Sequence, residues 1–175
     1  MALIKVNYFS RALLRNTDVM VIIPTETVAD LGKSDSCIFR GEHPVLYLYH
    51  GAYGDYTDWI RFTDIEAYAQ KYQLAVVMPS VDNSFALNIG LGNDYLTFAG
   101  EELPQYMEHL FPVSRSYGKK FVAGLSMGGY VAYSIALHYP QKFSHMVSLS
   151  GALVLDTLIE MQKQGMAGLP FDKEE

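Results

Sequence analysis

Residues 124 to 129 read Gly-Leu-Ser-Met-Gly-Gly and place the pattern G-x-S-x-G around Ser126. A short apolar run precedes the pattern and a helical pattern follows it, which predicts a turn from strand to helix. Such a turn holds a serine hydroxyl above a sheet, where it can attack an acyl carbon, and it needs small residues such as Gly124 and Gly128 around the serine. We therefore expect Ser126 to be a catalytic nucleophile. The alternative is a glycine-rich turn whose serine merely caps the helix.

A second candidate segment, His50-Gly51-Ala52-Tyr53-Gly54, follows another apolar run at 45–49. Loops at the carboxyl ends of parallel strands build the sites of open α/β sheets, and Gly51 would let the backbone approach a substrate carbonyl. The backbone N–H groups of Ala52 and Met127 would then form an oxyanion hole. We expect His50 to fix this loop by hydrogen bonding rather than to act as a general base. An ordinary glycine turn is the alternative for this segment.

The substrate pocket is expected beside a long loop, 80–93, that comes directly after an apolar run. Loops of this length are usually functional or mobile. Tyr53, Phe85 and Leu87 are the candidate apolar contacts with the substrate. An ordinary surface loop without a role in binding is an equally good interpretation of residues 80–93. We expect Asp94 to cap the next helix rather than to serve as a catalytic acid. No Cys/His cluster has the spacing of metal ligands, so neither a metal nor another cofactor is expected.

A sheet is needed to position these residues, and four short apolar runs are typical of strands buried on both faces. The runs are 45–49, 74–78, 121–124 and 145–149. Helical patterns at 65–72, 94–111 and 127–139 separate them, with a kink or a break expected at Pro104. Two further strands, 3–9 and 18–23, come first and are separated by a polar turn at 15–17. This alternation predicts an α/β fold with a mostly parallel sheet and helices on both faces.

Five segments in one order resemble the tributyrin esterase and acetyl esterase group of bacterial α/β-hydrolases, a group related to S-formylglutathione hydrolases (esterase D). They are His50-Gly51 with Trp59, Val-Val-Met-Pro at 76–79, Glu-Glu-Leu-Pro at 101–104, Ala-Gly-Leu-Ser-Met-Gly-Gly at 123–129 and Phe-Ser-His-Met-Val-Ser-Leu-Ser-Gly-Ala-Leu at 143–153. The resemblance implies the α/β-hydrolase fold and a serine carboxylesterase acting on small, short-chain acyl esters. It also implies Ser126 as nucleophile and the Ala52 and Met127 amides as oxyanion donors. Trp59 is expected to pack under the oxyanion loop.

The catalytic triad of this fold follows the order serine, acid, histidine. No Asp or Glu lies between Ser126 and His145, and no histidine follows Asp156, so residues 1–175 cannot complete that order. Residues 156–175 resemble the start of a cap or lid. We expect a single α/β-hydrolase domain, 1–175, that lacks the last strands and helices at its C-terminus. The strand at 145–149 would then have an unpaired edge, and a polypeptide of these residues alone is expected to associate.

Composition narrows the partners and the compartment. The net charge is −6 and the basic residues are scattered, which argues against a nucleic-acid partner. No apolar stretch is long enough for a membrane span, and the single cysteine fits a reducing compartment. We expect a cytoplasmic protein that binds a small-molecule ester, with a homo-oligomer possible. An acyltransferase on the same fold is the alternative function, or a non-catalytic scaffold if the chain truly ends at Glu175.

Overall fold

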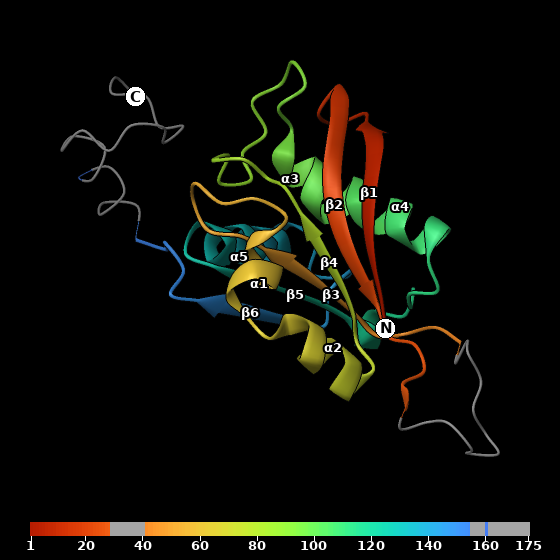
Figure 1. The fold of residues 1–175 in the computed structure, drawn as a ribbon. Helices are drawn as coiled ribbons and strands as arrows, with labels where there is room; N and C mark the ends of the chain where they lie inside the picture. The colour runs from red at the N-terminus through yellow and green to blue at the C-terminus, as the bar shows by residue number, and fades with distance from the viewer. Residues whose placement is uncertain (29–40, 155–159, 161–175) are drawn as a thin grey trace.

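Six strands form one sheet in the order β1-β2-β4-β3-β5-β6 in the computed structural model, which describes residues 1–28, 41–154 and 160 (Figure 1). The strands are β1 (Ala2–Ser10), β2 (Arg15–Ile23), β3 (Val45–Tyr49), β4 (Ala75–Pro79), β5 (Lys120–Leu125) and β6 (His145–Leu149). β2 is antiparallel to both β1 and β4, whereas β3, β4, β5 and β6 run parallel to one another. The prediction of a mostly parallel sheet is therefore confirmed.

The direction of the parallel strands defines two ends of the sheet, which we call the carboxyl end and the amino end. His50 and Ser126 follow β3 and β5 directly, so both lie at the carboxyl end. The loop 80–93 follows β4 and lies there as well. Because β2 is antiparallel to β4, the turn at 11–14 before β2 also reaches the carboxyl end. The sheet thus brings together four segments that are far apart in the sequence.

Helices cover both faces of the sheet, as predicted (Figure 1). One layer contains α1 (Asp58–Phe62) and α2 (Ile65–Tyr72). The other contains α3 (Tyr95–Thr97), a π-helical segment (Phe98–Glu102), α4 (Leu103–Leu110) and α5 (Met127–His138), and a short 3₁₀ turn (Tyr117–Lys119) precedes β5. The sequence pattern did not predict α1. None of the helices in the described ranges combines the length and the apolar character that crossing a lipid bilayer requires.

The hydrophobic core consists of two clusters, one on each face of the sheet, because successive side chains along a strand point to opposite faces. Tyr47 and Val77 pack into the layer of α4 and α5, whereas their neighbours Leu48 and Val76 pack into the layer of α1 and α2. All four side chains are buried. Burial of each such side chain stabilises the fold by about 1.5–3 kcal/mol. These strands therefore form a rigid base for the loops at the carboxyl end.

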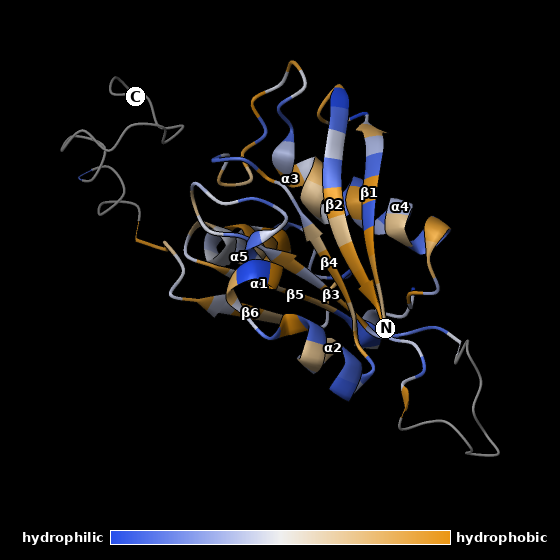
Figure 2. Cartoon of the chain, in the orientation of Figure 1, coloured by the Kyte–Doolittle hydropathy of each residue, from blue (hydrophilic) through white to orange (hydrophobic). Residues whose placement is uncertain are grey.

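The start of β2 differs from the prediction, which was wrong in placing a turn at 15–17. Arg15 pairs with Ser10 as the first residue of the strand, and the turn occupies 11–14, where Leu14 has a φ of 49°. The error arose because the true turn contains Ala12, Leu13 and Leu14, while the strand begins with polar residues. Figure 2 shows the same contrast, since β2 is hydrophilic at its start and hydrophobic toward its end.

The predicted helix 94–111 is divided in the structure, as expected around Pro104. The break precedes the proline, because the π-helical segment 98–102 lies between α3 and α4 and Pro104 occupies the first turn of α4. That position tolerates proline, which has no N–H to donate. Asp94 stands at the N-cap position, but its carboxylate accepts a hydrogen bond from the Gly90 N–H and caps no helix amide. Asp94 therefore occupies the predicted N-cap position, but the expected capping hydrogen bond from its side chain is absent.

β6 is the last strand of the sheet and pairs with β5, without a second partner among the described residues. Met146, Val147 and Leu149 are 37%, 51% and 43% exposed. These values contrast with β4, which is buried along its whole length. The segment predicted as the start of a cap, 156–175, lies outside the described residues except for Glu160.

Candidate active site

Ser126 occupies the turn between β5 and α5 in a backbone conformation that non-glycine residues rarely adopt. Its φ is 55° and its ψ is −115°, and its side chain is exposed. The Ser126 N–H donates to the Leu149 carbonyl oxygen at 2.9 Å, and the Ser126 carbonyl oxygen accepts from the N–H groups of Tyr130 and Ala152, each at 3.1 Å. A conformation of this kind costs about 1–3 kcal/mol and persists where the surroundings hold it in place. Three backbone hydrogen bonds hold Ser126 in that way.

The glycines on either side of Ser126 are required by close backbone contacts. A Cβ at Gly124 would lie 2.2 Å from the Gly128 carbonyl oxygen. A Cβ at Gly128 would lie 2.3 Å from the Tyr49 carbonyl oxygen and 2.5 Å from that of His50. Backbone atoms cannot move aside as a flexible side chain can, so any larger residue would separate α5 from β3 and β5. These contacts are the reason why both positions require glycine, as the motif predicts.

The segment after β3 faces Ser126. A Cβ at Gly51 would lie 3.7 Å from the Ser126 Cβ and 3.5 Å from the Leu125 carbonyl oxygen. In the part of the chain that the structure describes, neither the Ala52 N–H nor the Met127 N–H donates to a protein acceptor. Met127 is also the first residue of α5, where the unpaired amides and the helix dipole favour negative charge. The two predicted oxyanion donors are therefore both unpaired, and they belong to the two segments that approach each other at Ser126 and Gly51.

His50 is 1% exposed, and both of its ring nitrogens have backbone partners. Nδ1 lies 2.7 Å from the Gly51 carbonyl oxygen, which can only accept, so Nδ1 carries the proton. Nε2 lies 3.0 Å from the Val81 nitrogen and accepts its N–H. His50 is therefore a neutral imidazole with no lone pair left for a substrate or a serine. The prediction that it fixes the loop by hydrogen bonding is confirmed.

The three predicted pocket residues lie in different environments. Tyr53 is 62% exposed and has a φ of 67°. Phe85 is buried, with its ring at an edge to that of Tyr130 in α5 and the centroids 5.7 Å apart. Leu87 is partly buried against the same core. Tyr53 thus presents the most accessible surface of the three, while Phe85 forms the base of the loop.

Asn83, which was not predicted as a site residue, contacts the 50–54 loop directly. Its side-chain oxygen accepts the Tyr53 N–H at 2.7 Å. The only signal in the sequence was that an amide side chain follows a buried strand closely. Trp59 in α1 is partly buried against the core cluster that contains Ile22, Leu48 and Met78, so its role in packing is confirmed, while its position under the 50–54 loop stays a prediction.

A charged cluster that sequence analysis also missed anchors the loop 80–93 to β2. Arg15 Nη2 lies 2.5 Å from an Asp82 carboxylate oxygen, and the Tyr95 hydroxyl donates to that oxygen and accepts from Arg15. Burial, with a further contribution from this hydrogen bond to Asp82, raises the pKa of Tyr95 to about 12. Arg15 is 67 positions from Asp82 and 80 positions from Tyr95 in the sequence. The cluster therefore stabilises the loop next to Asn83.

None of the five histidines is placed as a general base for Ser126. His43 precedes β3 at the amino end, and His109 lies in α4. His138 ends α5, about 18 Å from Ser126 at the rise of an α-helix. His145 pairs with Phe121 at the start of β5, about 17 Å from Ser126 at the rise of a strand. Across the described residues, no three His, Cys, Asp or Glu side chains group together to hold a metal ion.

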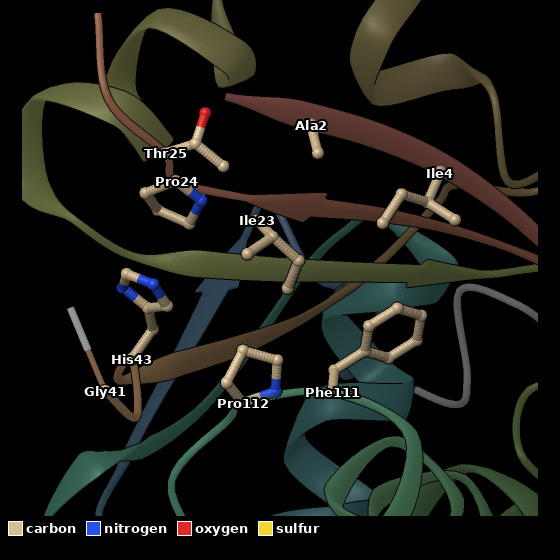
Figure 3. A pocket seen from close by; sticks show the side chains of 9 residues that line it. All are labelled: Ala2, Ile4, Ile23, Pro24, Thr25, Gly41, His43, Phe111 and Pro112. Atoms are coloured by element: carbon tan, nitrogen blue, oxygen red, sulfur yellow. The ribbon is translucent and has the colours of Figure 1, made fainter. Parts of the chain in front are cut away.

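A pocket of about 200 Å³ lies at the amino end of the sheet (Figure 3). Its lining includes Ile4 of β1, Ile23 of β2, His43 and Phe111. His43 and Phe111 precede β3 and β5, whereas Ser126 follows β5. The pocket is therefore at the opposite end of the sheet from the nucleophile and does not belong to its site.

Comparisons with known proteins agree with this geometry. The profile of a family described as "Putative esterase" matches residues 15–166. The acetyl esterase of Caldicellulosiruptor saccharolyticus is 32% identical over 173 residues, which are 98% of this chain and 61% of that protein. The substrate-bound structure of the fluorophosphonate-binding serine hydrolase FphF of Staphylococcus aureus has a TM-score of 0.80 at 32% identity and covers 98% of this chain and 62% of that one. The S-formylglutathione hydrolase FrmB of the same organism has a TM-score of 0.77 at 34% identity, with coverages of 91% and 61%.

The chain thus spans about three fifths of the length of these relatives. The sequence similarity extends over 173 residues, and the described fold and the ordered motifs agree with it. On this evidence the chain belongs to the esterase family.

Proposed function

We propose that the protein is a serine carboxylesterase that hydrolyses small, short-chain acyl esters through an acyl-enzyme at Ser126. The observation that supports this most is the exposed hydroxyl of Ser126 on a constrained turn, next to the backbone of Gly51 and the unpaired amides of Ala52 and Met127. An exposed nucleophile with two unpaired donors beside it matches the requirements of acyl transfer. The names of the relatives, an acetyl esterase and two serine hydrolases, support the same chemistry.

The reaction proceeds in two halves. The Ser126 hydroxyl attacks the ester carbonyl carbon, and its proton passes to a general base. The Ala52 and Met127 amides hold the negative oxygen of the tetrahedral intermediate. The intermediate expels the alcohol, which takes the proton, and leaves an acyl group on Ser126. Water then attacks this acyl group by the same route in reverse and releases the acid.

The general base in this proposal is a histidine outside residues 1–175, oriented by an acid that also lies outside them. The five histidines in these residues are distant from Ser126 or, in the case of His50, fully hydrogen-bonded. The order of the triad in this fold also places both residues after the serine in sequence. Their identification needs the complete gene product.

The substrate would enter at the carboxyl end of the sheet, beside Tyr53 and the loop 80–93. Tyr53 is exposed there, and Phe85 and Leu87 give the loop an apolar base. An apolar surface with few polar groups suits a short acyl chain or a small alcohol.

Hydrolysis of p-nitrophenyl acetate, butyrate and octanoate by the complete gene product tests the proposal. We expect turnover that is fastest with the short chains and that falls by about 10⁴-fold or more in Ser126→Ala. Ser116→Ala is the control, because Ser116 is exposed near the amino end of β5. Undiminished turnover in Ser126→Ala would contradict the proposal.

The acyl group on Ser126 can also be discharged by an alcohol other than water, so acyl transfer is the alternative outcome. Product analysis with a competing alcohol separates the two activities. Mainly free acid supports an esterase, whereas mainly new ester identifies an acyltransferase. An absence of turnover, together with an unreactive Ser126, would identify a non-catalytic scaffold.

The compartment and the assembly are further parts of the proposal. A cytoplasmic location is supported by the single cysteine, and fractionation of the host cell tests it. The exposed apolar residues of β6 support self-association of a polypeptide of residues 1–175. Size-exclusion chromatography of that polypeptide should show oligomers or aggregates, and a monodisperse monomer would contradict the idea.

A further inference from the structure

The peptide unit that joins Gly51 to Ala52 has its orientation set by hydrogen bonds on its carbonyl side. The Gly51 carbonyl oxygen accepts from His50 Nδ1 at 2.7 Å and from the Gly54 N–H at 3.2 Å. A trans peptide is planar, with its C=O and N–H pointing in opposite directions. Two donors on the Gly51 oxygen therefore fix the direction of the Ala52 N–H, which is the proposed oxyanion donor.

His50 is itself held in place from the next strand. Its Nε2 accepts the Val81 N–H at 3.0 Å, directly after β4. The imidazole thus bridges the end of β3 and the end of β4, two strands that pair in the centre of the sheet. Rotation of the ring would break both hydrogen bonds and leave buried groups unpaired, since His50 is 1% exposed.

The following peptide unit is fixed by a different side chain. The Tyr53 N–H donates to the Asn83 side-chain oxygen at 2.7 Å. This bond holds Tyr53 in its left-handed conformation, with a φ of 67°. It also occupies the Tyr53 amide, so that this N–H does not compete with the unpaired Ala52 N–H for a developing negative charge. Asn83 in turn follows Asp82, which Arg15 and Tyr95 anchor.

We infer that His50 and Asn83 are positioning residues, which act on catalysis by fixing the Ala52 N–H toward the oxyanion. Neither side chain touches the reacting atoms. This inference rests on the proposed function, because it assigns a role in a reaction at Ser126. It goes beyond that function because it names two side chains, one after β3 and one after β4, that set the orientation of an oxyanion donor.

The test uses Asn83→Ala and His50→Gln in the complete gene product, with p-nitrophenyl acetate as substrate. Loss of one oxyanion donor lowers kcat by about 10²–10³-fold, so misorientation of that donor should lower kcat by about 10–100-fold. KM should stay within about 2-fold, because the ground state depends little on the oxyanion contact. Affinity for a trifluoromethyl ketone, which binds as a tetrahedral oxyanion, should fall in parallel with kcat.

Matched controls are available for both substitutions. His43 is also buried, and its Nδ1 lies 3.3 Å from the Gln73 carbonyl oxygen, but it precedes β3 at the amino end. Asn88 lies in the same loop as Asn83 and accepts the Leu96 and Thr97 amides instead. His43→Gln and Asn88→Ala should retain kcat within about 2-fold and retain affinity for the ketone.

The outcomes separate this inference from the proposed function. If Ser126→Ala abolishes turnover but Asn83→Ala retains full kcat and full affinity for the ketone, the positioning role is wrong and the esterase stands. If the parent protein does not depend on Ser126, both are wrong. Asn83 is only partly buried, so its alanine variant should fold even if His50→Gln does not.

Discussion

The two ends of the sheet differ in how their backbone is arranged. Among the described residues, nine non-glycine positions have a positive φ, and eight of them lie at the carboxyl end: Leu14, Tyr53, Asp82, Phe85, Ala86, Leu91, Ser126 and Ser150. Gln73, before β4, is the exception at the amino end. The amino end has instead an apolar pocket lined by residues such as Ile23 and Phe111. Strained backbone gathers where precise positions are needed, and ordinary packing suffices elsewhere.

The largest expected difference between the two ends concerns glycine substitutions. Gly128→Ala places a Cβ 2.3 Å from a backbone oxygen at the carboxyl end, whereas a Cβ at Gly118, near the amino end, has no atom within 4 Å. We expect Gly128→Ala to lower the free energy of unfolding by about 3 kcal/mol or more and Gly118→Ala to change it by less than about 1 kcal/mol. Urea unfolding followed by circular dichroism measures both. Equal effects would show that the close crossing of α5 and β3 is not required.

Removal of packing at the amino end should affect stability without affecting catalysis. Ile23 is 8% exposed and lines the pocket there. Ile23→Ala should cost about 3 kcal/mol, from lost burial and an enlarged cavity. The kcat of the folded fraction on a chromogenic ester should stay at the parental value. A large fall in kcat would contradict the separation of the two ends.

Relief of backbone strain at Ser126 should increase stability, whereas the two preceding kinds of substitution decrease it. Glycine adopts a φ of 55° readily, whereas alanine does not. We expect Ser126→Gly to be about 1 kcal/mol more stable than Ser126→Ala, although both are inactive. Thermal unfolding of the two variants side by side gives the comparison. A less stable glycine variant would argue against strain at this position.

The smallest effect is expected at high pH. The folded protein raises the pKa of Tyr95 to about 12, above the usual value near 10, so folding favours the neutral phenol. The stability from this group is fully present below about pH 10 and is lost as the pH rises toward 12. Tyr95→Phe should therefore lose less stability than the parent between about pH 10 and about pH 12. An identical loss in both proteins would mean that Tyr95 does not contribute.

Periodic features of the molecule could be predicted from sequence. The continuous apolar runs of β3 and β6 and the helical pattern of α2 have the observed bounds, because each depends on local spacing alone. Ser126, Gly124 and Gly128 could be predicted because the turn demands small residues at fixed offsets. In contrast, the Arg15, Asp82 and Tyr95 cluster joins residues far apart in sequence and has no periodic signal. Asn83 was missed for the same reason, and the turn at 11–14 because it is apolar.

Covalent labelling of Ser126 tests the central claim most directly. The complete gene product is treated with a fluorophosphonate probe, digested and analysed by mass spectrometry to locate the modified residue. The account predicts one adduct, on Ser126, that is lost in Ser126→Ala, that is lost on denaturation and that forms more slowly in Asn83→Ala. Absence of an adduct on the native protein, or equal labelling of another serine, would contradict it.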